Sequence, residues 1–514
     1  MSTTARSAAH PHDAGDAPLV VGVDCSTHGV KAIAWTLDGE AVAEGRAPVE
    51  LQRPAPGRYE QRASDWLAGT LAALGPVGAA VGPRVRAVGL THQRETFVDA
   101  DEAGAPLGPA IVWMDERAWA EVAALRAAFG EERFHRLTGK PLSMTPSVTK
   151  ILWLRAHEPA RFGRAARWLA VAAYLTRALT GAAVTSVGSA EPTGLVDLRA
   201  GRWSAEVLRA VGLDPSRLPA LVPTGAVAAT LLPTVTAPAG LPAATPLVLT
   251  AGDGQVAALG AQVYGLECAY LNLGTAIVAG TVSDEYLVDR AFRTMAGAIP
   301  GTFLLESDLK GGTFTIDWLC ERLLGATPLA RLEAEAATLP PGADGLLLVP
   351  YLATVMDPYW DDDASGLLVG LRGVHGPAHL LRAVFEGIAF EERLHLDAMG
   401  AAAGRRIEAV NVLGGGATSD LWCRILADVL GRPVRRTRSA EATSLGAAML
   451  AAAAVGLAPS ARAAADRMGG LAETFVPGVA AARYERLYRD VYAGLYPALR
   501  ESLGRLAAFV RSGG

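Results

Sequence analysis

The sequence predicts an α/β protein of two related domains, and three observations support this. The chain has 514 residues, more than one hydrophobic core usually supports, and 51% of them are hydrophobic. Residues 19–35 and 269–280 carry the same pattern of strand, small polar turn and strand, once in each half. Residues 409–430 add a strand, a glycine turn and a helix. We expect domains at 18–262 and 263–503, a disordered leader at 1–17 and a tail at 504–514.

Charge and cysteine content exclude several classes of protein. The net charge is −5, and the 47 Lys and Arg residues form no long basic run, which argues against nucleic acid as a partner. The four cysteines are far apart and lack the paired spacing of a metal site or a disulfide framework. These features favour a protein of the reducing cytoplasm that binds small molecules.

Two long uncharged segments do not predict membrane spans. Residues 218–252 are interrupted repeatedly by proline, and residues 445–461 are mostly alanine and glycine. The leader at 1–17 lacks the apolar core of a signal peptide. We therefore expect no membrane association.

The first structured segment, residues 19–35, predicts two strands around a small polar turn. Apolar and β-branched residues flank Ser26, Thr27 and His28, and a third strand follows the next turn. Such a turn can direct backbone N–H groups and a threonine hydroxyl at a phosphate, and Lys31 adds a cation close by. Because a strand follows the turn, this is not a dinucleotide-binding fingerprint, which needs a helix there.

A second turn with the same design lies in the other half. Residues 269–280 place Gly274 and Thr275 between two strands. Two facing turns could clamp the phosphates of one nucleotide. The alternative is two unrelated hairpins, with Lys31 an ordinary solvated strand residue.

The strongest helical periodicity lies at residues 379–399. Leu380, Val384 and Ile388 share an apolar face, and residues 391–393 (Glu, Glu, Arg) form a charged one. Strands are expected at 345–350 and 409–413. The second strand leads into the glycine turn 414–417 and a helix at about 419–430, where backbone can approach a flat ligand. The alternative is close packing of helix on sheet.

A single carboxylate, Asp253, stands between two glycines at the start of an alanine-rich run. A carboxylate held where the backbone passes close to a ligand can accept a proton from a substrate hydroxyl. This makes Asp253 the candidate catalytic base. The alternative is an aspartate that caps a helix after a glycine-rich turn.

Taken together, these motifs resemble the FGGY carbohydrate kinases, an actin-like (ribonuclease H-like) group of two-domain phosphotransferases with a catalytic cleft between the domains. The resemblance spans nearly the whole chain. It rests on residues 366–371 (GLLVGL) followed by 379–386 (HLLRAVFE), and on residues 59–61, 110–117, 350–352 and 414–417.

The resemblance implies the cofactors ATP and magnesium (Mg2+) and assigns roles to particular residues. Asp253 would be the base, Asp24 would lie near the magnesium-bound phosphates, and these two carboxylates would be the metal-binding candidates. The implied ATP- and phosphate-binding residues are Asp24, Ser26, Thr27, His28, Lys31, Gly274, Thr275, Gly311, Gly312, Gly415, Gly416, Ala417 and Asp420. The resemblance also implies a homodimer as one assembly.

Substrate choice is expected near residues 93–96, with Asp253 opposite. Arg94 supplies several fixed donors and Glu95 the acceptors that vicinal hydroxyls need, although such a pair is often a solvated surface pair. Trp113 would form a pocket wall or belong to the core. The string Gln-Arg-Glu-Thr at 93–96 resembles glycerol kinases, whereas xylulokinases usually carry a Gln-Met-His-Gly type of sequence.

Other positions resemble the ketose kinases more closely. Thr145 stands where glycerol kinases place a tyrosine, Gly254 stands where they place a glutamine, and the turn at 274–278 lacks their phenylalanine. A wider pocket follows. The leading hypothesis is an ATP-dependent xylulokinase, with glycerol kinase or a kinase of another pentulose or alditol as alternatives. A third hypothesis is a nucleotide-binding protein that has lost turnover, which the retention of Asp24, Lys31 and Asp253 disfavours.

Overall fold

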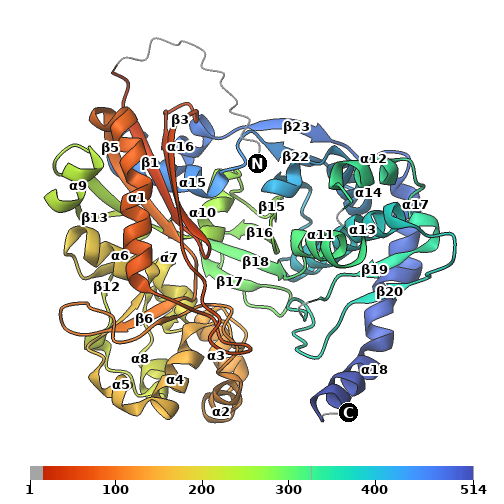
Figure 1. Ribbon diagram of the computed structural model, residues 1–514, viewed down its shortest axis with the longest axis horizontal. Coiled ribbons are helices and arrows are strands. Elements are labelled where there is room, and N and C mark those ends of the chain that lie inside the picture. The colour runs from red at the N-terminus through yellow and green to blue at the C-terminus, as the bar shows by residue number, and fades with distance from the viewer. Residues whose placement is uncertain (1–15, 326, 353, 513–514) are drawn as a thin grey trace.

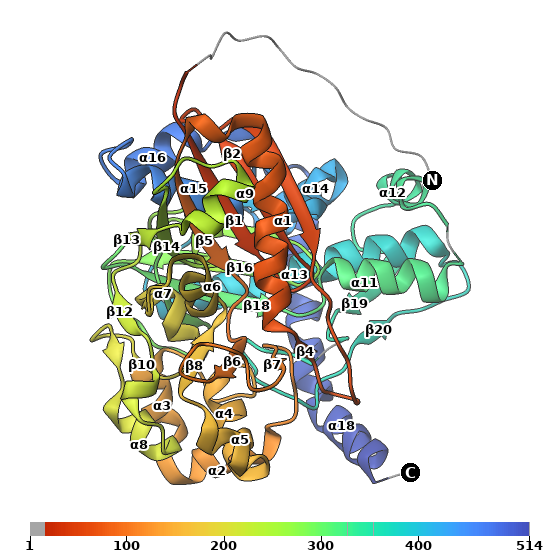
Figure 2. The ribbon, with the colours of Figure 1, turned by 60° about the vertical axis from the view of Figure 1, so that its left-hand side comes forward.

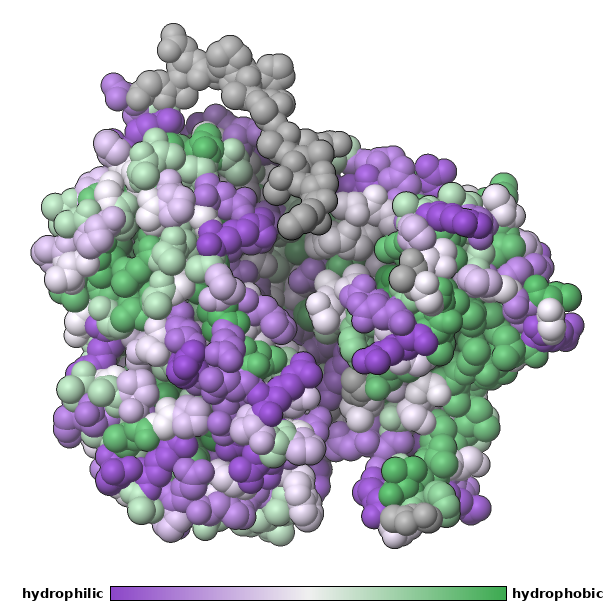
Figure 3. Space-filling model, viewed as in Figure 1, coloured by the Kyte–Doolittle hydropathy of each residue, from purple (hydrophilic) through white to green (hydrophobic). Residues whose placement is uncertain are grey.

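The computed structural model describes residues 16–512, apart from 326 and 353. The leader predicted at 1–17 lies almost wholly outside the described residues. The described chain forms two α/β bodies side by side, each built on a central mixed sheet (Figure 1). The surface is hollowed between the two bodies (Figure 3).

The N-terminal sheet has the strand order β13-β14-β5-β1-β2-β3. Its strands are β1 (Leu19–Cys25), β2 (Gly29–Trp35), β3 (Ala41–Pro48), β5 (Val85–His92), β13 (Ala226–Thr230) and β14 (Pro246–Gly252). The β1–β2 hairpin and the third strand follow the sequence prediction. Strand β1 pairs antiparallel with β2 and parallel with β5.

The C-terminal sheet has the order β17-β18-β16-β15-β21-β22-β23. Its strands are β15 (Cys268–Leu273), β16 (Ile277–Ser283), β17 (Arg293–Ala296), β18 (Phe303–Leu309), β21 (Ala409–Leu413), β22 (Val434–Thr437) and β23 (Leu471–Phe475). From β23 to β18, the sequence of parallel and antiparallel pairings repeats that of the N-terminal sheet from β13 to β3. The expectation of two related halves is therefore confirmed.

A smaller lobe is inserted below the N-terminal sheet (Figure 2). Its four-stranded sheet contains β4 (Glu60–Gln61), β6 (Phe97–Ala100), β7 (Ala110–Ile111) and β8 (Arg167–Ala170). Short pairs are formed by β9 (Val184–Ser186) with β12 (Ala220–Val222) and by β10 (Val196–Asp197) with β11 (Arg202–Trp203). The helices of this lobe are α2 (Trp119–Phe129), α3 (Glu131–Thr138), α4 (Ser147–His157), α5 (Pro159–Arg164) and α8 (Ala205–Val211). Helices α6 (Val171–Thr180) and α9 (Pro233–Ala239) belong to the core of the N-terminal sheet, and α7 (Val187–Ala190) contacts β14.

Helix α1 (Ala63–Val81) is the one helix of the described chain that is long and apolar enough to cross a membrane. It packs against β2 and β3, and Trp66, Ala73, Leu74 and Val77 of this helix belong to the core of the N-terminal body. Its apolar composition is therefore explained by packing on the sheet.

Helices α15 (Ala442–Ala454) and α16 (Ala461–Met468) lie in sequence between β22 and β23 of the C-terminal sheet but belong to the core of the N-terminal sheet. The indole N–H of Trp35 donates to Ser444 Oγ, and this hydroxyl donates to Gly22 O. A Cβ at Gly22 would lie 1.9 Å from the carbonyl oxygen of Ser444, so a glycine is required for this close approach. A single boundary at 262/263 therefore separates residues 442–468 from the body on which they pack.

Six further helices of the described chain belong to the C-terminal body. They are α11 (Thr313–Trp318), α12 (Leu329–Ala337), α13 (Pro377–Ala402), α14 (Asp420–Leu430), α17 (Ala481–Leu487) and α18 (Ala493–Arg511), with β19 (Leu347–Val349) and β20 (Leu367–Val369) beside them. Helix α18 projects from this body and continues to Arg511, so the predicted tail at 504–514 begins inside a helix (Figure 2).

The charged face predicted for α13 is wrong at two positions. Glu391 and Glu392 are 2% and 0% exposed. The hydroxyl groups of Tyr351 and Tyr492 donate to the carboxylate of Glu391 at 2.7 and 2.8 Å. Residues distant in sequence therefore cover this side of the helix.

Candidate active site

Asp253 lies where β14 ends and helix α10 (Asp253–Gly260) begins. Its Oδ1 accepts the backbone N–H of Gly254 at 2.8 Å and lies 2.9 Å from Nε of Arg94. Its side chain remains 39% exposed, whereas that of Arg94 is only 8% exposed. A carboxylate fixed at one oxygen and open to solvent elsewhere has the geometry that a general base needs.

The two glycines beside Asp253 make room for Arg94. A Cβ at Gly252 would lie 2.4 Å from Cγ of Arg94, and a Cβ at Gly254 would lie 2.5 Å from Oε2 of Glu306. The expectation that these glycines let backbone approach a ligand therefore needs correction. They let the arginine lie against the base, and this explains why position 254 has no glutamine side chain.

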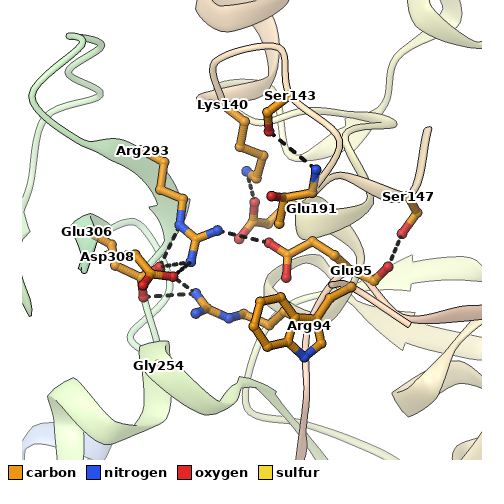
Figure 4. A network of polar contacts seen from close by, with 12 residues as sticks. Arg94, Glu95, Lys140, Ser143, Ser147, Glu191, Gly254, Arg293, Glu306 and Asp308 are labelled. Carbon is orange, nitrogen blue, oxygen red and sulfur yellow. Dashed lines mark hydrogen bonds and ion pairs between the residues drawn. The ribbon is translucent and has the colours of Figure 1, made fainter. Parts of the chain in front are cut away.

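Arg94 and its neighbour Glu95 join a buried network that connects the two bodies (Figure 4). Nη1 of Arg94 lies 2.9 Å from both carboxylate oxygens of Glu306, which is on β18. Arg293, on β17, lies 2.7 Å from Glu306 Oε1 through Nη2 and 3.4 Å from Glu95 Oε1 through Nη1. Nη2 of Arg293 is also 3.7 Å from Asp308 Oδ2.

The electrostatics of this network follow from burial and pairing. Burial alone would lower the pKa of Arg94, but the carboxylates of Glu306, Asp253 and Glu95 raise it well above its ordinary value. Burial would raise the pKa of Glu306, but Arg94 and Arg293 hold it below its ordinary value. Both groups of the cross-domain pair are therefore charged. Burial raises the pKa of Glu95 despite its arginine neighbours.

A second buried ion pair lies beside the first. Lys140 contacts Glu191 through Nζ and also donates to the carbonyl oxygen of Thr138 at 2.9 Å. Nε2 of Gln255 donates to Glu191 Oε1 at 3.0 Å. Figure 4 shows Lys140 and Glu191 facing the same space as Glu95 and Arg293. Donors and acceptors therefore alternate around this part of the site, as recognition of a polyhydroxy compound requires.

Asp24 is the last residue but one of β1 and lies close enough to Asp253 for the two charges to interact. Its Oδ1 is buried and has no hydrogen-bond partner among the described residues. Burial, followed by the charge of Asp253, raises the pKa of Asp24 to about 7. Magnesium typically takes one or two protein carboxylates together with substrate phosphates, so the free oxygen of Asp24 fits this ion. Oδ1 of Asp253 is already engaged by Arg94. Among the residues that the structure describes, no group of three or more His, Cys, Asp or Glu could hold a metal alone.

The side chains of the first turn are used within the protein more than expected. The hydroxyl of Ser26 donates to Gly29 O at 2.9 Å, and Nζ of Lys31 lies 2.5 Å from Glu441 Oε2. Both side chains therefore have partners within the protein, and their role in phosphate binding stays a prediction. His28 is exposed.

Thr27 and Trp113 are joined to each other. The indole N–H of Trp113 donates to Thr27 Oγ1 at 3.0 Å, and Thr27 Oγ1 donates to Gln93 Oε1 at 3.1 Å. Trp113 is half-buried, which agrees with a pocket wall better than with a core position. The hydrogen bonds connect the polar turn with the residues next to Arg94.

The second turn packs against a pair of glycines. Backbone N–H groups of Thr313 and Phe314 donate to the carbonyl oxygens of Gly274 and Thr275 at 2.8 and 3.2 Å. A Cβ at Gly312 would lie 2.6 Å from Gly274 O, and one at Gly311 would lie 2.2 Å from Pro350 O. The sequence reasoning correctly grouped these segments, and Gly311 and Gly312 serve this close packing.

The glycine turn after β21 forms a short helical turn, Gly415–Thr418. Gly415 is exposed, and a Cβ there would meet no atom within 4 Å. Gly416 packs against Trp422, and Ala417 is 3% exposed. Asp420 lies 2.7 Å from Nη2 of Arg436. Gly415 therefore offers open backbone surface, whereas the methyl group of Ala417 faces the core.

Sequence reasoning missed Arg293, Glu306, Glu191 and Lys140. A signal for one of them was present: residues 303–309 (FLLESDL) form a strand that carries two carboxylates, Glu306 and Asp308, and acidic residues are seldom fully buried without a partner. The charged side chains that contact Arg94 depend on how the two sheets pack, and the local sequence pattern does not predict this packing.

Comparison with known proteins agrees with this arrangement. Residues 19–260 match the N-terminal domain, and residues 269–455 the C-terminal domain, of the FGGY family of carbohydrate kinases. The chain is 31% identical to xylulose kinase of Escherichia coli over 84% of its length and 89% of that protein. It is 33% identical to glycerol kinase of Symbiobacterium thermophilum over 91% of its length and 96% of that protein.

A solved structure gives the same picture. The crystal structure of xylulose kinase from Rhodospirillum rubrum superposes with a TM-score of 0.85 at 30% identity, covering 94% of this chain and 99% of that one. The two-domain fold with its pair of mixed sheets is thus the actin-like fold of these kinases. The chain belongs to the FGGY family of carbohydrate kinases, which phosphorylate a sugar or polyol with ATP.

Proposed function

We propose that this enzyme transfers the γ-phosphoryl group of ATP to a hydroxyl of a ketose, with D-xylulose as the substrate and D-xylulose 5-phosphate and ADP as products. The observation that carries the proposal is the contact of Asp253 Oδ1 with Arg94 Nε at 2.9 Å beside the free oxygen of Asp24. A base and a candidate metal ligand therefore share one part of the cleft.

In the proposed reaction, Asp253 accepts the proton of the attacking hydroxyl while the new O–P bond forms and the bond to the β-phosphate oxygen breaks. Arg94 keeps the carboxylate in one orientation and stays charged. Magnesium, held by Asp24 and the phosphates, would supply positive charge that offsets the charge of the transferring group. Closure of the domains keeps water from taking the place of the sugar.

The choice of a substrate longer than glycerol is supported by Thr145, which stands where glycerol kinases have the larger tyrosine. The room at Gly254 is taken by Arg94 and Glu306 and does not support it. Glycerol is the second candidate, and the sequence Gln-Arg-Glu-Thr at residues 93–96 favours it. Another pentulose or an alditol is the third. We place the enzyme in the reducing cytoplasm because its four cysteines are free thiols.

The test is a comparison of kcat/KM for purified enzyme with ATP and D-xylulose, L-xylulose, D-ribulose, L-ribulose, ribitol, erythritol and glycerol. The proposal expects sugar-dependent ADP release with the highest kcat/KM for D-xylulose. A higher value for glycerol than for every ketose would replace it with glycerol kinase. No stimulation by any compound would contradict both.

A further inference from the structure

A row of side chains crosses four strands of the C-terminal sheet and ends beside the catalytic base. In the register of the sheet, Tyr270 on β15 pairs with Gly280 on β16, Gly280 with Glu306 on β18, and Glu306 with Arg293 on β17. Glycine in the second place lets the tyrosine ring lean toward Glu306, since a Cβ at Gly280 would lie 2.8 Å from Tyr270 Cε1. The Tyr270 hydroxyl lies 3.3 Å from Glu306 Oε2.

Glu306 is the only group of this row that touches an arginine of the N-terminal body in the described structure. Its Oε1 contacts Arg94 Nη1 and Arg293 Nη2, and its Oε2 contacts Arg94 Nη1 and the Tyr270 hydroxyl. The side chain is 0% exposed, so each of these contacts is made without competing water. Within the network, Arg94 in turn contacts Asp253 through Nε.

We propose that Glu306 is a positioning residue: through Arg94, the docked C-terminal domain fixes the orientation of the Asp253 carboxylate, with Arg293 holding Glu306 and Glu95 in place. The catalytic part of this inference rests on the proposed function. Arg94 is fixed at Nη1 by one domain and fixes the base with Nε, so rotation of its guanidinium group is restrained only when both domains are in contact.

This arrangement makes assembly of the base conditional on domain docking. When the domains separate, Arg94 loses its cross-domain carboxylate, and Glu306 and Arg293 stay together on their own sheet. The Asp253 carboxylate then gains freedom that a reacting base must lose. The network thereby lowers the chance that ATP is attacked by water in the open enzyme.

The first test is Glu306→Gln, which keeps the shape and removes the charge. We expect kcat for sugar phosphorylation to fall by about 10- to 100-fold, because small misplacement of a reacting group costs about that much, with the Kd for ATP unchanged. The matched control is Glu386→Gln. Glu386 is also buried and paired with an arginine of its own domain, Arg382 at 2.7 Å, but lies outside the site.

The second test is Gly254→Ala, which keeps every charge. The added Cβ would lie 2.5 Å from Glu306 Oε2 and 3.2 Å from Arg94 Nη1, so the cross-domain pair must shift. The expected result is again a lower kcat with unchanged ATP affinity. Gly75→Ala is the control, since a Cβ at that position of α1 meets no atom within 4 Å.

A scattering measurement separates this inference from the proposed function. If docking depends on Glu306, the radius of gyration of the ligand-free protein increases in Glu306→Gln and in Gly254→Ala but not in either control. Unchanged kcat and an unchanged radius in both variants would overturn the inference while wild-type activity stands. If the wild type phosphorylates no sugar, the proposed function fails, and the radius alone decides whether Glu306 holds the domains together.

Discussion

Nζ of Lys31, next to the phosphate turn, lies 2.5 Å from Oε2 of Glu441, a residue 410 positions later that directly precedes α15. The two side chains are 24% and 33% exposed, and Nη2 of Arg46 is 3.3 Å from the other oxygen of Glu441. A phosphate that reaches this lysine must compete with a carboxylate that is already there. The pair is accessible enough for that exchange to occur.

Removing the competitor should therefore improve nucleotide binding. We expect Glu441→Gln to lower the KM for ATP by about two- to fivefold, in line with the ~0.5–1 kcal/mol of a partly exposed ion pair, with kcat little changed. Glu44→Gln, which removes the other carboxylate beside Arg46, is the control. An ATP KM that is the same in wild type and Lys31→Met would show that Lys31 does not meet the phosphates.

The hydrogen bond between Trp113 and Thr27 predicts a specific effect on sugar binding. Thr27→Val leaves the indole N–H of Trp113 and Oε1 of Gln93 without this partner, at a cost of about 1–3 kcal/mol. We expect a higher KM for the sugar and a lower melting temperature, measured by steady-state kinetics and calorimetry. Thr27→Ser keeps the hydroxyl, so its KM for the sugar and its melting temperature should match those of wild type. If they match those of Thr27→Val, the effect comes from the methyl group and not from the hydrogen bond.

The raised pKa of Asp24 predicts a pH dependence of stability. Because burial raises the pKa from 3.8 to about 7, the folded protein binds more protons than the unfolded chain between these values. The stability that Asp24 contributes is therefore complete below pH 3.8 and is lost as pH rises through about 7. Asp24→Asn should stabilise the ligand-free protein at pH 8, by up to about 4 kcal/mol, and much less at pH 5.

The readout for Asp24 is the urea midpoint at the two pH values, with Asp490→Asn, an exposed surface position, as control. Magnesium and ADP should stabilise wild type at pH 8 more than they stabilise Asp24→Asn. If magnesium and ADP stabilise the two proteins equally, Asp24 does not take part in binding the magnesium-bound phosphates.

Lys150 predicts the opposite pH dependence. It is fully buried and donates to the carbonyl oxygens of Trp113 and Thr145 at 3.0 and 2.7 Å. Burial lowers its pKa from 10.5 to about 7, so the unfolded chain binds more protons between these values, and stability rises with pH across this window.

In Lys150→Met this rise in stability with pH should be absent. The stability of the variant relative to wild type should therefore be highest at pH 7 and lowest at pH 9.5, as measured by the urea midpoints of both proteins at the two pH values. A parallel pH dependence in the two proteins would mean that Lys150 keeps an ordinary proton affinity in the fold.

The sequence was informative where function depends on local pattern. The turn after β1, the repeat at Gly274 and Thr275, and Asp253 at a helix start are each defined by neighbours within a few residues, and all were located correctly. Side-chain partners across the fold were not accessible in this way. Lys31 meets Glu441, and Arg94 meets Glu306 from the other domain, because of how two sheets pack.

The same limit explains the error at α13. Helical periodicity correctly gave the helix, but the burial of Glu391 and Glu392 depends on Tyr351 and Tyr492 from elsewhere in the domain. Likewise, the sequence shows the glycines on either side of Asp253, but not that Arg94 packs against them and leaves no room for a side chain there.

The central claim is that Asp253 takes the proton of the sugar hydroxyl, and Asp253→Asn tests it most directly. With the best substrate of the panel, sugar-dependent ADP release and ATP affinity would be measured for wild type and variant. The account predicts a loss of about 100- to 10,000-fold in kcat, the usual contribution of a general base, with ATP still bound at the wild-type Kd. A variant that phosphorylates sugar at a rate near wild type would contradict it.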